Sequence, residues 1–139
     1  MSEEAGLPVM VYIHGGGFAM RSPREFNPNL LLERDIILVV PQYRLGPLGF
    51  LAAGIDSAPG NAGLLDMVLA LRWVRDNIVT FGGNPGRVTL FGQSSGAAAA
   101  ALMLFSPLVD PGIIQFVICI MQNRACNNSL RNFDKTYFS

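Results

Sequence analysis

The sequence predicts an α/β fold in which a mostly parallel sheet is flanked by helices. Three short apolar runs are expected to form strands, at residues 9–13, 36–40 and 88–91. An apolar helical segment between the second and third runs ends near Asn77. Strands that are apolar throughout and alternate with helices are typical of parallel sheets that are covered on both faces. We therefore expect both faces of this sheet to be covered.

Local signals support each of these elements. Asn61 is a suitable N-cap for the helix that runs to about Asn77. The glycine- and proline-containing segment 82–86 predicts a turn before the third strand. The alanines of residues 97–101 predict a helix that packs closely on its neighbours. The expected order is β–loop–β–α–β–α, with room for one more strand.

The composition describes one domain with few charges. The chain has 139 residues, of which 50% are hydrophobic and 14% charged, whereas about a quarter are charged in an average domain. This depletion is expected for a piece of a larger protein, although a small domain with an unusually apolar sequence is the alternative. The zero net charge favours neither nucleic acid nor an anionic membrane as partner. The longest apolar stretch, residues 97–105, is too short for a membrane span.

The most informative motif is Gly92-Gln93-Ser94-Ser95-Gly96, between the third strand and the alanine-rich helix. The pattern Gly-x-Ser-x-Gly in this context is the nucleophile elbow of α/β-hydrolases. The sharp turn is expected to strain the backbone of the serine by about 1–3 kcal/mol. The positions two before and two after it need to be nearly free of side chain, because strand and helix almost touch there. We therefore expect Ser94 to be a catalytic nucleophile.

A second motif, His14-Gly15-Gly16-Gly17-Phe18, directly follows the first strand. Acyl transfer requires backbone N–H groups aimed at the oxygen that becomes negative in the tetrahedral intermediate. Successive glycines can present such donors without side-chain obstruction. We expect the N–H groups of Gly16 and Gly17, with that of Ser95 after the nucleophile, to form an oxyanion hole. The alternative is a flexible loop with no such role.

Three further segments carry a family resemblance: 43–51, with Tyr43-Arg44-Leu45-Gly46 and Gly49-Phe50-Leu51, then 61–78, then 81–92. Together with the two motifs they resemble the carboxylesterase type B (cholinesterase-like) family of the α/β-hydrolase superfamily, from about residue 7 to 112. The Gln93-Ser94-Ser95 variant is similar to insect esterases of that family. The resemblance implies a serine esterase with no cofactor and no metal. Its expected partner is a small carboxylic ester, and Gln93, where a glutamate is common, favours neutral substrates over cationic choline esters.

The catalytic triad is the main departure from the family. A serine nucleophile needs a general base, which an acid orients, and in α/β-hydrolases the acid and then the histidine follow the serine. The single histidine, His14, precedes Ser94. We therefore expect an α/β-hydrolase fold that is truncated at both ends, and a chain that is inactive alone. His14 as the base is the alternative, but the resemblance implies that this residue braces the oxyanion loop.

The resemblance also divides the chain. Residues 1–112 are expected to form a partial α/β-hydrolase domain, and residues 113–139 a divergent C-terminal tail, because the family pattern decays from Ile114. Trp73 is expected to have a packing role, since its helix is apolar nearly all round. Two other functions stay open at this point. One is a non-catalytic, adhesion-type binding module, against which the intact Ser94 and the glycines argue; the other is a truncated product without function.

Overall fold

A computed structural model describes residues 6–56, 58–121 and 124–126 of the chain. Its main sheet has the strand order β2-β1-β5-β6-β7. The strands are β1 (Leu7–Ile13), β2 (Ile37–Val39), β5 (Gly83–Gln93), β6 (Phe116–Met121) and β7 (Arg124–Cys126). The pairs β1–β2, β1–β5 and β5–β6 are parallel, and β7 is antiparallel to β6. The prediction of a mostly parallel α/β sheet is confirmed.

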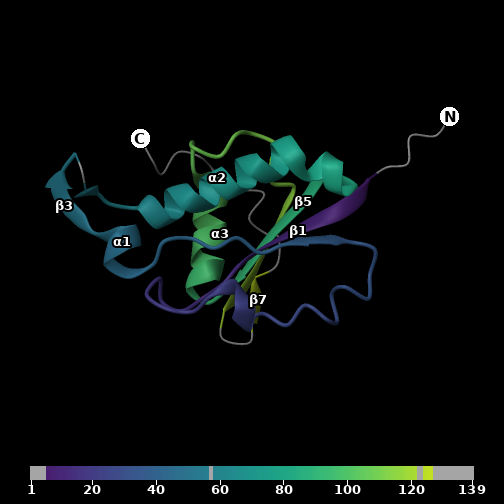
Figure 1. The fold of residues 1–139 in the computed structure, drawn as a ribbon, viewed down its shortest axis with the longest axis horizontal. Helices are drawn as coiled ribbons and strands as arrows, with labels where there is room; N and C mark the ends of the chain where they lie inside the picture. The colour runs from purple at the N-terminus through teal and green to yellow at the C-terminus, as the bar shows by residue number, and fades with distance from the viewer. Residues whose placement is uncertain (1–5, 57, 122–123, 127–139) are drawn as a thin grey trace.

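Two long helices pack on this sheet, α2 (Ala62–Asn77) and α3 (Ser95–Phe105). Figure 1 shows α2 running across the strands, with a small subdomain at its N-terminal end. That subdomain consists of the short α1 (Gly46–Phe50) and a hairpin of β3 (Ala52–Ile55) and β4 (Ala58–Pro59). Two 3₁₀ turns complete the described structure, η1 (Pro23–Glu25) and η2 (Ile78–Phe81).

Both long helices cover the same face of the sheet. One cluster of buried side chains joins alternate residues of the strands, such as Val9, Val11 and Leu90, to Leu71 of α2 and Ala100 of α3. The prediction of a sheet flanked by helices is confirmed, and within the described part of the chain both long helices lie on one face. The strands are apolar on both faces, and this pattern gives no information on which segment covers each face.

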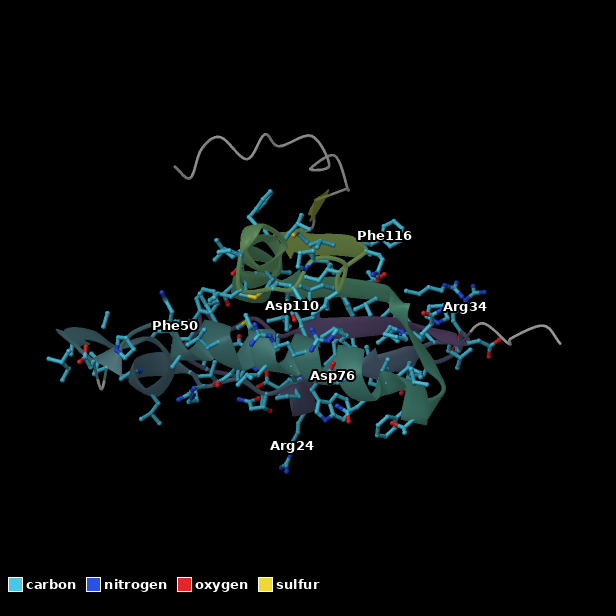
Figure 2. The ribbon with its side chains drawn as sticks, turned by 90° about the horizontal axis from the view of Figure 1, so that it is seen from above. Arg24, Arg34, Phe50, Asp76, Asp110 and Phe116 are labelled. Carbon is cyan, nitrogen blue, oxygen red and sulfur yellow. The ribbon has the colours of Figure 1, made fainter. Side chains whose placement is uncertain are left out.

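The opposite face is only partly covered. Tyr12 and Phe91 are buried there beneath Phe26, whose ring lies 4.0 Å from that of Tyr12 between centroids. On β6, which lies between β5 and β7, Ile118 and Ile120 are each 38% exposed. Figure 2 shows Phe116 at the same strand, projecting from the body of the molecule. This face of β6 is apolar surface in contact with solvent.

Three local details differ from the sequence predictions. The third strand begins at Gly83, because Leu7 pairs with Gly83 and the intervening residues form a bulge before Val9 pairs with Val88. Asn61 is the N-cap of α2, but its side chain makes no capping hydrogen bond and its φ is 57°. Trp73 is 46% exposed, so it packs at the surface, where its ring lies 5.7 Å from that of Phe81.

The segment after residue 112 contributes to the same sheet. β6 pairs with β5 over five positions, from Thr89 opposite Phe116 to Gln93 opposite Ile120. The division of the chain at residue 112 stays a prediction, and residues 127–139 of the expected tail lie outside the described residues. Among the described helices, none is both long and apolar enough to cross a membrane.

Candidate active site

Ser94 lies at the junction between β5 and α3. Its φ of 56° and ψ of −123° fall in a region that glycine adopts freely and that strains other residues by about 1–3 kcal/mol. Its N–H donates to the carbonyl of Ile120 at 2.9 Å, and its own carbonyl accepts from Ala97 at 2.9 Å in the first turn of α3. The side chain itself is exposed. The predicted strained turn at Ser94 is confirmed.

The two glycines of the motif make this turn sterically feasible. A Cβ atom on Gly92 would lie 2.4 Å from the backbone of Gly96. A Cβ atom on Gly96 would lie 2.1 Å from the carbonyl oxygen of Ile13, at the end of β1. Both separations are far below van der Waals contact, so strand and helix approach each other to backbone distance on both sides of Ser94.

The loop His14–Phe18 lies directly against this turn. A Cβ atom on Gly15 would lie 2.6 Å from the carbonyl oxygen of Gln93 and 3.2 Å from Cβ of Ser94. The N–H of Phe18 donates to Oγ of Ser95 at 3.4 Å. The loop and the turn meet because β1 and β5 are parallel neighbours, so that their C-terminal ends share one edge of the sheet.

Three N–H groups near the turn have no hydrogen-bond partner in the part of the chain that the structure describes. Within the described residues, no hydrogen bond uses the N–H of Gly16, Gly17 or Ser95. Gly17 has a φ of 62° and open space where a Cβ atom would stand. Ser95 is the first residue of α3, where the partial positive charge of a helix N-terminus favours a developing anion. These groups are available to a ligand, and their assignment as an oxyanion hole stays a proposal.

His14 is enclosed beneath this loop. It is only 3% exposed, and its Nδ1–H donates to the carbonyl of Gly15 at 2.8 Å. Its ring stacks on that of Tyr43, with 4.5 Å between centroids. Within the described part of the chain, no hydrogen bond joins the imidazole to Ser94. These contacts support a bracing role for His14 rather than the role of base.

Tyr43 holds the same loop through a polar contact. Its hydroxyl donates to the carbonyl of His14 at 2.7 Å. The side chain is buried, and burial, with a smaller contribution from Tyr12, raises the pKa of Tyr43 to about 12. The phenol is therefore a neutral donor throughout the physiological range, which keeps the carbonyl of His14 in place.

An ion pair fixes the backbone that carries Tyr43. The carboxylate of Asp66 on α2 accepts from the Arg44 guanidinium at 2.7 and 2.8 Å and from its backbone N–H at 2.9 Å. The hydrogen bond from Arg44 holds the pKa of Asp66 below its usual value. The loop is tied to α1 as well, where the N–H of Gly46 donates to the carbonyl of Phe18 at 2.7 Å. α1 and α2 thus support the loop beside Ser94.

Comparison with known proteins decides the family. A model of the carboxylesterase family matches residues 1–136. The chain belongs to the carboxylesterase family. This carboxylesterase chain is 52% identical over 114 residues to juvenile hormone esterase of Tribolium castaneum, covering 81% of this chain and 19% of that protein. It is 50% identical over 102 residues to venom carboxylesterase-6 of Apis mellifera, covering 73% of this chain and 18% of that protein.

A solved structure shows the same fold. The chain superposes on juvenile hormone esterase from Manduca sexta, crystallised with OTFP covalently attached, at a TM-score of 0.76 and 46% identity. The match covers 81% of this chain and 21% of that one. The carboxylesterase chain therefore has part of an α/β-hydrolase fold and is similar to insect esterases of type B. It spans about a fifth of the length of these relatives.

Several residues around the site have positions that no local sequence pattern predicts. Tyr43 and Asp66 stand in segments that carried the family resemblance, yet nothing local indicates that they brace a loop some thirty and fifty positions away. Arg21, whose guanidinium lies 3.5 Å from Oε1 of Gln93, follows the glycine motif without any recognisable pattern. Among the described residues, no group of three or more His, Cys, Asp or Glu side chains could hold a metal ion.

Proposed function

We propose that this carboxylesterase hydrolyses carboxylic esters, with Ser94 as nucleophile. The observation that carries the proposal is the strained, exposed Ser94 at the β5–α3 junction, in contact with the loop that contains Gly16 and Gly17. A residue in such a conformation persists only where the surrounding structure holds it, and such strain is concentrated at functional sites. Membership of the carboxylesterase family supports ester hydrolysis as the chemistry.

The proposed reaction has two steps. Oγ of Ser94 attacks the ester carbonyl carbon, and the electron pair of the C=O bond moves to oxygen. That oxygen accepts hydrogen bonds from the N–H groups of Gly16, Gly17 and Ser95. Collapse of this intermediate expels the alcohol, which takes up the proton that Ser94 lost, and leaves an acyl-enzyme. Water then attacks the acyl group and releases the carboxylic acid and the free serine.

The general base is assigned to none of the described residues. His14, the single histidine of the sequence, donates its Nδ1–H to a backbone carbonyl and stacks on Tyr43. We therefore expect the 139-residue chain alone to be inactive or nearly so, because the serine hydroxyl is a weak nucleophile without a base. In a serine protease that lacks its triad, the oxyanion hole and substrate binding still accelerate the reaction about 10³–10⁴-fold over the rate in water. This is the largest rate acceleration that we expect of the chain alone.

The substrate is proposed to be a neutral ester. Gln93, next to the nucleophile, is uncharged, and so contributes no negative charge that would attract a cationic alcohol group. Two relatives have names that fit this class, juvenile hormone esterase and a pyrethroid hydrolase of Rattus norvegicus that is 42% identical over 132 residues. Others, such as cholinesterase 1 of Branchiostoma lanceolatum, have names that do not, so the proposal rests on Gln93.

A fluorophosphonate probe, which labels activated serines, tests the proposal. The chain alone is expected to remain unlabelled. A hybrid, in which residues 7–121 replace the matching segment of the Tribolium esterase, is expected to be labelled and to hydrolyse a short-chain nitrophenyl ester.

Two substitutions at adjacent serines of the hybrid form a test and its control. Ser94→Ala is expected to abolish labelling, whereas Ser95→Ala retains most of it, because the proposed reaction uses only the backbone N–H of Ser95 and its hydroxyl makes one long contact, 3.4 Å from the N–H of Phe18. Equal labelling of the Ser94→Ala hybrid would overturn the proposal. No labelling of a folded hybrid would favour a non-catalytic binding module. Rapid, Ser94-dependent turnover by the chain alone would instead assign the base to a residue within it, with His14 the first candidate.

A further inference from the structure

The chain has two cysteines, Cys119 and Cys126, and the proposed ester hydrolysis uses neither. Cys119 lies on β6, and Cys126 is the last residue of β7. The two strands are antiparallel, and their register places Cys119 directly opposite Cys126. Directly opposite residues of an antiparallel pair share one face of the sheet. The two cysteines are therefore cross-strand neighbours in the fold, although six residues separate them along the chain.

This register meets the backbone requirement of a disulfide. Directly opposite residues of antiparallel strands have Cα atoms about 4.5–5.5 Å apart. A disulfide joins residues whose Cα atoms are about 4.4–6.8 Å apart. The next pair along the two strands, Ile120 and Ala125, belongs to the other face of the sheet. A shift of either cysteine by one position would thus place the two on opposite faces.

The surroundings of Cys119 hold it in place. The residue is 3% exposed, and its partner on β5 is Gly92. Its Sγ donates to the carbonyl of Ala97, in the first turn of α3, at 3.4 Å. A disulfide would remove this donor, but an S–H group is a weak donor, and a carbonyl in a helix also accepts from the N–H four residues later. Oxidation therefore costs little at Cys119, and one of the two partners is fixed before the bond forms.

We propose that Cys119 and Cys126 form an intramolecular disulfide, which joins β7 to β6. The oxidant is a small disulfide of the glutathione class. One cysteine thiolate attacks it and forms a mixed disulfide with release of one glutathione, and the other thiolate then attacks the mixed disulfide and releases the second. Two protein thiols are thereby oxidised, one glutathione disulfide is reduced, and the two protons pass to the glutathione thiols.

The redox state of the surroundings sets the state of this pair. Glutathione keeps thiols reduced in the cytosol, whereas disulfides persist in oxidising compartments. The pair also lies close to the candidate active site, because the carbonyl of Ile120, the residue after Cys119, accepts from the N–H of Ser94 at 2.9 Å. The proposed modification is therefore on the strand that contacts the backbone of the proposed nucleophile.

Thiol counting in the full chain measures the bond. The chain is equilibrated with mixtures of reduced and oxidised glutathione, quenched with acid, alkylated with N-ethylmaleimide under denaturing conditions and weighed by mass spectrometry. The expected product is a monomer that takes up no maleimide before reduction and one at each of its two cysteines after it. The equilibrium constant for oxidation is expected to be at least about tenfold larger in native buffer than in concentrated urea, because a disulfide that fits the native structure stabilises it.

A register variant is the matched control. The double variant Ala125→Cys, Cys126→Ala keeps two cysteines at nearly the same spacing along the chain, but places the second one opposite Ile120. It is expected to be oxidised no more readily in native buffer than in urea. Equal ratios of native to urea constants for the natural chain and the variant would overturn the proposal. Equal constants in both solvents for the natural chain, or its oxidation to disulfide-linked dimers in place of the monomer, would overturn it as well.

Discussion

At the scale of single residues, Tyr43 connects the sheet edge to the loop beside Ser94. Its hydroxyl donates to the carbonyl of His14 at 2.7 Å in a buried setting. Removing the hydroxyl leaves that carbonyl without this donor, and we expect Tyr43→Phe to lower the free energy of unfolding by about 1–3 kcal/mol. Urea unfolding at pH 8 measures the change.

The raised pKa of Tyr43 also predicts the alkaline behaviour of Tyr43→Phe. Burial raises the pKa in the folded state to about 12, against 10.0 for a free tyrosine. The neutral phenol is thus favoured by folding, so its contribution to stability is complete below pH 10 and is lost as the pH rises towards 12. The difference in unfolding free energy between wild type and Tyr43→Phe should shrink over this window. A constant difference from pH 8 to 12 would contradict this.

At the scale of elements, the Arg44–Asp66 pair ties α2 to the segment that carries Tyr43. The hydrogen bond from Arg44 lowers the pKa of Asp66 in the folded state. The stability that it provides is therefore present above the ordinary carboxyl range, near pH 4, and is lost as the pH falls through the lowered value. We expect Asp66→Asn to destabilise the chain at pH 7 and to be nearly neutral at the lowest pH. The exposed Asp35 gives the control Asp35→Asn, which is expected to change the stability at pH 7 less, because substitutions at exposed positions usually have small effects.

A second tie between elements lies at the opposite end of α2. The carboxylate of Asp110 forms an ion pair with Arg75, and its oxygen lies 3.6 Å from Arg72. Asp76 lies beside Arg75 at 2.6 Å, and Figure 2 shows both acids along this helix. All these side chains are about half exposed, so water screens their attraction and each pair contributes little to stability.

The sequence predicted those elements whose signals are local. The elbow at Ser94 follows from two glycines and a strand–helix boundary, and the structure shows why, since Gly96 meets the carbonyl of Ile13. The role of Tyr43 was not predictable, because it depends on a contact between positions 29 residues apart. The placement of both long helices on one face was missed for a similar reason. Apolar residues on both faces of a strand indicate that both faces of the sheet are buried. Only the tertiary structure shows which segment buries each face.

At the scale of the whole molecule, the uncovered face of β6 predicts self-association. Ile118 and Ile120 are each 38% exposed and alternate along one face of that strand. Contiguous apolar surface of this kind promotes association. We expect the purified chain to form oligomers and Ile118→Lys to reduce their size, as measured by size exclusion with light scattering. A sharp monomer peak for the unsubstituted chain would contradict the prediction that this surface causes self-association.

The backbone conformation of Ser94 has an evolutionary consequence. At a φ of 56° and ψ of −123°, glycine would relieve the strain, so Ser94→Gly is expected to raise the free energy of unfolding by about 1 kcal/mol or more, whereas Ser94→Ala retains the strain. Chemical denaturation of the three chains measures this order. Selection for a stable fold therefore favours glycine at position 94, whereas selection for ester hydrolysis favours serine. In a lineage released from the need to hydrolyse esters, glycine is the replacement that we expect to spread first.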